Sequence, residues 1–177
     1  LLRTVRKASK SKDSIENLPD LSIEKISEHL SIIERSKPWN LVGYIKDKLF
    51  EMESSKFSVL LDKIKDLGNI TFINHLNKLK ARVTDKEILR SIDETISYLN
   101  QISVDCEDLN KIIGFVGSKN FEDRIYGAKL IGASSNQEIK NNLTFLMRDL
   151  VPAVKKQAIW AAKGTKSKEV IIFLIDF

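Results

Sequence analysis

The sequence is poor in the residues that several protein classes require. Its single cysteine, Cys106, excludes a disulfide framework within one chain and a thiolate zinc site, and it favours a reducing, cytoplasmic setting. Seven glycines and three prolines are few for an all-β chain, which needs many turns. No apolar run approaches the roughly 18 residues of a membrane-spanning helix. With only His29 and His75, a metal site would consist mostly of carboxylates.

The positive charge of the chain is concentrated at its N-terminus. The net charge is +5, and residues 1–12 hold five basic residues and no acidic one: Arg3, Arg6, Lys7, Lys10 and Lys12. The other 24 basic residues are matched by 24 acidic residues, so the rest of the chain is balanced. We interpret residues 1–18 as a basic flexible tail or linker. Membrane contact through residues 1–12 is an alternative, because each Lys or Arg beside an anionic leaflet contributes about 1 kcal/mol, and nucleic-acid contact is another.

From Pro19 onward, apolar residues recur at helical spacing almost without interruption. Ile26, Leu30 and Ile33, for example, fall on one face of a helix. Short connections favour antiparallel packing of successive helices. We therefore expect one all-α domain over residues 19–177, with about ten helices within residues 20–36, 39–52, 56–68, 70–83, 85–102, 107–118, 121–134, 136–149, 149–164 and 166–177.

Several residues mark the expected helix ends. Gly68 is placed where a helix C-terminal glycine belongs, and Asn69 is placed to cap the next segment. Thr84 followed by Glu87 has the spacing of a capping box. Asn120 and Asp149 each open a helix in the C-terminal part of the chain.

The C-terminal part contains a degenerate repeat. Aligning Asn120 with Asp149 gives a period of about 29 residues, aligning Ala128 with Ala158 gives about 30, and aligning residues 138–143 with 169–174 gives about 31. A period near 30 is typical of diverged helical hairpins that stack into a solenoid. The sequence therefore predicts an α-solenoid of antiparallel helical hairpins.

The segment "DLVPAVKKQAIWAAKG" (residues 149–164) resembles the first helix of a HEAT repeat, close to the short variant of the phycobilisome lyases. The matching residues are Asp149, Val154, Lys155, Ala158, Ala162 and Gly164. The preceding unit departs from the pattern, because Asn120 replaces Asp and the order of Arg124 and Ile125 is inverted. The resemblance is good over residues 120–177 and compatible over 39–118. It implies a fold and no particular chemistry.

The same segment has a physical interpretation. Asp149 can accept backbone N–H bonds at a helix start, and Pro152 falls in the first turn. Alanines at 158, 161 and 162 let a neighbouring helix approach, and Trp160 then fills the groove between hairpins. We favour a packing role for Trp160, with an exposed binding contact as the alternative.

No residue pattern in the chain indicates catalysis, a cofactor or a metal. Cys106 lies among acidic residues, which raise the pKa of a thiol, and His75 has no catalytic partner in the sequence. One basic cluster is a candidate partner-binding surface, with Tyr126 at an equivalent position of the preceding unit: Arg148, Lys155, Lys156 and Lys163, extended by Lys166 and Lys168. The alternatives for this cluster are a solvated helix face, a contact with an acidic protein and a contact with nucleic-acid phosphates.

These observations favour a non-catalytic helical-repeat scaffold that binds a protein partner. One alternative is a cytosolic regulatory domain of a larger membrane protein, with the basic tail next to the bilayer. Another is a nucleic-acid-binding solenoid, as in the helical-repeat DNA glycosylases, which the fold also resembles. No small-molecule substrate is evident. The chain starts at Leu1 and ends in an apolar segment, so we expect it to be part of a longer protein.

Overall fold

The computed structural model describes residues 18–36, 40–162 and 167–176, and this part of the chain is helical with no strand. The all-α prediction is thereby confirmed, while residues 1–17 of the predicted tail lie outside the described ranges. The α-helices are α2 (Ile23–Ser36), α3 (Leu41–Lys48), α4 (Phe57–Leu67), α5 (Ile73–Lys80), α6 (Lys86–Asp105), α7 (Leu109–Val116), α8 (Phe121–Ala133), α9 (Gln137–Lys140), α10 (Leu143–Met147), α11 (Pro152–Ala161) and α12 (Lys168–Asp176).

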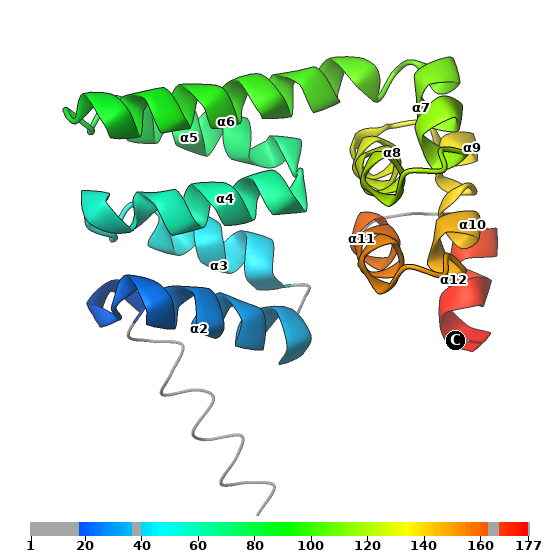
Figure 1. The fold of residues 1–177 in the computed structure, drawn as a ribbon, viewed down its shortest axis with the longest axis horizontal. Helices are drawn as coiled ribbons and strands as arrows, with labels where there is room; N and C mark the ends of the chain where they lie inside the picture. The colour runs from blue at the N-terminus through cyan, green and yellow to red at the C-terminus, as the bar shows by residue number, and fades with distance from the viewer. Residues whose placement is uncertain (1–17, 37–39, 163–166, 177) are drawn as a thin grey trace, which may run out of the picture.

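The helices form two groups, α2–α6 and α7–α12 (Figure 1). In the first group, α2, α4 and α6 lie side by side, with α3 and α5 behind them. After α6 the chain turns, so α8 and α11 run across the direction of α6 and are seen end-on. These two helices pack on each other, while α7 packs on α8 and α10 packs on α11 and α12 as an outer layer. The two groups meet where α6 contacts α8.

The buried core follows the apolar stripes of the sequence. In α2, the side chains of Ile26, Leu30 and Ile33 are buried, and the stripes of α3, α4 and α6 are buried in the same way. Isolated helices of this length are marginal in water, so each is stabilised by the neighbour that covers its apolar face. The core is continuous through both groups.

The ends at Gly68 and Asn69 agree with the sequence predictions, whereas the start of α6 does not. Gly68 ends α4 in the left-handed conformation, with φ of 59°, and the Asn69 side chain accepts a hydrogen bond from the Thr71 N–H. At α6, however, the N-cap is Asp85, whose carboxylate accepts from the N–H groups of Glu87 and Ile88. The predicted capping box on Thr84 is therefore wrong. The chain uses the adjacent carboxylate, which also favours the positive end of the helix dipole.

Small residues allow α8 and α11 to cross closely. A Cβ atom added to Gly132 would lie 3.0 Å from the Cβ of Ala161. Ala128 and Ala158, which the repeat alignment makes equivalent, are both completely buried. The expectation that the alanines of residues 149–164 permit close helix approach is confirmed at this crossing.

Replacing Gly132 with leucine tests this crossing. We expect Gly132→Leu to lower the free energy of unfolding by about 1–3 kcal/mol, because the new side chain needs space that Ala161 occupies. The matched control is Gly114→Leu in α7, where no atom lies within 4 Å of an added Cβ. The control is expected to be as stable as the wild type or slightly more stable, because leucine is a better helix former than glycine. Urea denaturation measures both, and equal losses would contradict a close crossing.

Candidate functional site

A bidentate ion pair joins two successive turns of the second group. Arg124 lies in α8, and Asp149 lies in the turn between α10 and α11. The Arg124 Nε is 2.6 Å from Asp149 Oδ2, and Arg124 Nη2 is 3.0 Å from Asp149 Oδ1. The side chains are only 15% and 7% exposed. Two parallel hydrogen bonds between a guanidinium and a carboxylate fix the relative orientation of the two groups as well as their distance. The pair therefore holds the two turns in a fixed relative position.

Each partner of this pair also orders its own turn. Arg124 Nη1 donates to the carbonyl oxygens of Ser118 and Lys119, at 2.9 and 3.0 Å. Asp149 Oδ1 accepts from the Val151 N–H at 2.8 Å, but the N-cap of α11 is Val151, so the prediction that Asp149 itself opens this helix is wrong by two residues. The hydrogen bonds from Arg124 outweigh burial and hold the pKa of Asp149 below its ordinary value. The carboxylate is therefore ionised and both turns are fixed around it.

A groove of about 460 Å³, which we call the turn groove, opens beside this ion pair. Two of its apolar side chains face solvent, since Leu150 is 94% exposed and Phe145 is 62% exposed. Exposed side chains of this size next to a concave surface are typical of interaction sites. The groove is lined by Val116, Gly117, Ser118, Arg124, Phe145, Arg148, Asp149 and Leu150.

Arg148 supplies the free positive charge of the turn groove. Its guanidinium carbon lies 4.9 Å from the centroid of the Phe173 ring, in a cation–π contact. None of the described carboxylates lies within ion-pair distance of Arg148. The Arg124 charge in the same groove is already compensated by Asp149. Of the predicted partner-binding residues, Arg148 is thus the one that the structure places in a groove.

The predicted lysines do not form one surface. Lys155 is half-buried in α11, and its charge helps to lower the pKa of Asp149. Lys156, the next residue, points to the first group, where its Nζ is 2.9 Å from Glu34 Oε1 in α2. Burial alone would raise the pKa of Glu34, but hydrogen bonds from Lys156 and Lys63 hold it below its ordinary value. Lys156 therefore joins α11 to α2.

Tyr126 is engaged inside the molecule. Its hydroxyl donates to Asp105 Oδ2 at 3.1 Å, and its ring meets Phe115 edge-on with centroids 4.9 Å apart. Burial and the Asp105 carboxylate together raise the pKa of Tyr126. The structure thus does not place Tyr126 beside Arg148 or Lys155 in the turn groove. The remaining predicted residue, Lys163, lies outside the described residues, as does Lys166.

Sequence reasoning missed Phe145, Leu150 and the role of Arg124. A large apolar residue at 150, in a turn just before Pro152, was the available signal, because turn positions are usually solvated. The helical spacing of apolar residues did not distinguish the exposed Phe145 from the buried Leu146 and Met147 beside it. Arg124 was noted only as a departure from a repeat pattern.

The cysteine and the clusters of metal-ligating side chains are the remaining candidates for chemistry in the described ranges. Cys106 is buried, and burial with the neighbouring Glu107 carboxylate raises the pKa of its thiol to about 11. No cluster of three or more His, Cys, Asp or Glu residues suited to a metal occurs in the part of the chain that the structure describes. In the same ranges, no helix combines the length and the apolar character needed to cross a membrane.

Comparisons with known proteins add no relative. No protein-family model, curated protein or solved structure matches this chain. The class that the structure defines is that of all-helical proteins, and the HEAT-like resemblance stays a prediction from the sequence.

The lowered pKa of Asp149 gives a test by pH. An aspartate whose folded-state pKa is depressed stabilises the fold above its unfolded-state pKa of about 3.9, and that contribution is lost as the pH falls through the folded-state value. We expect Asp149→Asn, which keeps an acceptor for Val151, to be less stable than the wild type at pH 7. The difference should shrink below about pH 4.

Urea denaturation between pH 7 and pH 3 measures this difference. The matched control is Asp93→Asn, because Asp93 pairs with Lys80 at an exposed site where both side chains are more than a third accessible. Exposed pairs contribute little, so the control should follow the wild-type curve at every pH. A gap between wild type and Asp149→Asn that is constant with pH would contradict the ionised pair.

Proposed function

We propose that this chain is a non-catalytic, cytoplasmic helical-repeat module that binds a segment of a protein partner in the turn groove. The observation that carries the proposal is the combination of Leu150 and Phe145, both exposed, with the Arg148 charge that lacks a carboxylate. Exposed apolar area supplies affinity, and a free cation at its edge selects a partner of opposite charge. The occupant is therefore an extended peptide segment with an apolar side chain next to an acidic one.

A repeat architecture is supported by similar contacts before two successive helices, although Asn120 is the N-cap of α8 and Asp149 lies two residues before the N-cap of α11. Asn120 accepts a hydrogen bond from the N–H of Glu122, and Asp149 accepts one from the N–H of Val151, each two residues further on. The Arg124–Asp149 pair links these two turns. We infer that the units stack in the HEAT-like manner, as hairpins of an α-solenoid whose neighbouring turns form one edge.

The balance of charge favours a protein partner over nucleic acid. A phosphate-binding surface requires several uncompensated cations in a row. In the described part of this surface, Arg124 is paired with Asp149 and Lys156 with Glu34. Arg148, Lys155 and Lys168 are left, and these few charges suit a carboxylate-bearing segment better than a polyanion. The membrane-attached alternative rests on residues 1–12, which lie outside the described residues. It concerns other residues than those of the turn groove and is compatible with peptide binding there.

A peptide-display selection against the complete chain tests the proposed function. We expect selected peptides to combine an aromatic or aliphatic residue with a neighbouring Asp or Glu. Fluorescence anisotropy with such a peptide should give binding that Leu150→Asp and Arg148→Glu each weaken by about tenfold or more. A peptide with Lys in place of its acid should bind Arg148→Glu better than it binds the wild type.

The controls are changes of the same kind elsewhere on the surface. Val104→Asp adds a charge at another exposed apolar side chain, and Arg90→Glu reverses an exposed charge in α6. Both should bind the peptide as the wild type does. Selected peptides without acidic enrichment, or equal binding by Leu150→Asp, would contradict the proposal. Duplex-DNA binding at about 50 mM salt that falls steeply with added salt would support the nucleic-acid alternative instead.

A further inference from the structure

A second groove, of about 390 Å³, lies between α2 and α4 in the first group, and we call it the α2–α4 groove. The two helices lie side by side and contact each other (Figure 1). The residues that α4 contributes are three or four positions apart, so they share one face of that helix. Among the lining residues are Ile23 and Glu24 of α2, and Val59, Asp62, Lys63 and Asp66 of α4.

The α2–α4 groove carries more negative than positive charge. Three carboxylates line it, together with one ammonium group, that of Lys63. The Lys63 charge is directed to Glu34, whose Oε2 lies 2.9 Å from the Lys63 Nζ. None of the described basic side chains lies within ion-pair distance of Glu24, Asp62 or Asp66. A positively charged segment would therefore meet uncompensated carboxylates here.

Apolar side chains accompany the carboxylates of the groove. The Ile23 side chain is 42% exposed, and Val59 is half-buried. Apolar area supplies affinity, whereas charged groups beside it select the charge of the partner. The α2–α4 groove therefore fits a segment that carries both apolar and basic side chains.

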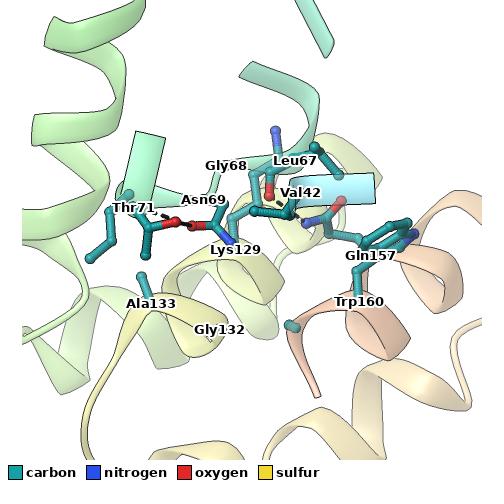
Figure 2. Close-up of a pocket in the computed structure, with 12 residues that line it drawn as sticks. Val42, Leu67, Gly68, Asn69, Thr71, Lys129, Gly132, Ala133, Gln157 and Trp160 are labelled. Carbon is teal, nitrogen blue, oxygen red and sulfur yellow. Dashed lines mark hydrogen bonds between the residues drawn. The ribbon is translucent and has the colours of Figure 1, made fainter. Parts of the chain in front are cut away.

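The cavity of about 240 Å³ at the junction of the two helix groups has a different character (Figure 2). Its polar side chains are used within the fold. Lys129 Nζ donates to the Lys65 carbonyl oxygen and to the Tyr98 hydroxyl. Gln157 donates to the Leu67 carbonyl oxygen. The three carboxylates of the α2–α4 groove have no described cationic partner, so that groove is the better candidate for a charged occupant.

The basic segment of residues 1–12 is an occupant that the chain itself supplies. It holds five basic side chains and no acidic one, with Leu1, Leu2 and Val5 among them. It thus combines apolar and basic side chains, the complement of the apolar and acidic side chains of the groove. About ten residues separate it from Ile23 at the groove, and a stretch of that length can span up to about 35 Å. A tethered segment meets a site on its own domain at a high effective concentration.

The spacing of the charges also agrees. Asp62 and Asp66 are four residues apart on α4, which corresponds to a rise of about 6 Å. In an extended segment, side chains two residues apart point to the same side and are separated by about 6.5–7 Å. Lys10 and Lys12 have this spacing. One extended stretch can therefore place an ammonium group beside each carboxylate of α4.

We propose that the α2–α4 groove binds residues 1–12 of the same chain. Lys10 and Lys12 pair with the two carboxylates of α4, and the apolar side chains of the segment lie against those of the groove. Docking compensates positive charge that would otherwise attract an anionic bilayer or nucleic acid. The α2–α4 groove shares no residue with the turn groove, so its test is independent of the peptide-binding proposal.

Carbodiimide cross-linking of the complete chain, read by mass spectrometry, tests this pairing. The reagent joins a lysine amine to a carboxylate in contact with it, so we expect links from Lys10 or Lys12 to the α4 carboxylates. These links should be at least about fivefold fewer at about 500 mM salt than at about 20 mM, because salt screens exposed charges. Asp20 is exposed and nearer to the segment in sequence, so it reports what tethering alone produces. Links to Asp20 as frequent as those to Asp62 and Asp66, or links only between isotope-labelled and unlabelled chains, would overturn the proposal.

Tryptic cleavage within residues 1–12 gives a second readout. Asp62→Asn/Asp66→Asn removes two exposed carboxylates that form no described ion pair, so at low salt the segment should be cleaved at least about threefold faster than in the wild type. The matched control, Glu87→Gln/Glu94→Gln, removes the same charge from exposed positions of α6 and should be cleaved at the wild-type rate. Equal rates for the wild type and the α4 variant would overturn the proposal. Protection only in the presence of vesicles with about 30% phosphatidylserine would assign the segment to a membrane and would overturn it as well.

Discussion

The bidentate contact between Arg124 and Asp149 is the constraint on which the second helix group depends. It is nearly buried, and each partner also binds the backbone of its own turn. Losing either partner would leave a desolvated charge uncompensated, which is costly in a protein interior. With the two turns fixed, α8 and α11 start in register and meet at Gly132 and Ala161. Leu150, the next residue after Asp149, is 94% exposed.

The junction between the two helix groups has a different character. Polar contacts add to the continuous apolar core there: Lys129 donates to a carbonyl at the end of α4, and Lys156 pairs with Glu34 of α2. Small apolar residues at the α8–α11 crossing exclude water, whereas the junction encloses a cavity of about 240 Å³. The junction is therefore less densely packed than the α8–α11 crossing.

Much of the fold was predictable from the sequence because local patterns determine it. Apolar spacing located the helices, and Gly68 and Asn69 end and begin them as expected. The cap at Asp85 was misassigned because Thr84 and Asp85 are both good N-caps and differ only in register. The candidate site was harder to predict from the sequence. The Arg124–Asp149 and Glu34–Lys156 pairs depend on which helices become neighbours in the fold. The periodicity of a single sequence does not show which helices pack together. Arg148 was predicted because the basic residues cluster locally in the sequence, whereas the exposure of Phe145 and Leu150 has no such local pattern.

A double-mutant cycle on Arg124 and Asp149 tests the central claim most directly. Arg124→Met, Asp149→Asn and the double variant are compared with the wild type by urea denaturation at pH 7. If the two side chains hold adjacent turns together, each single change leaves its partner buried and unpaired. The double variant should then lose clearly less stability than the sum of the two single losses. Strictly additive losses would mean that the side chains act independently, which would contradict this account of how the turn groove is built.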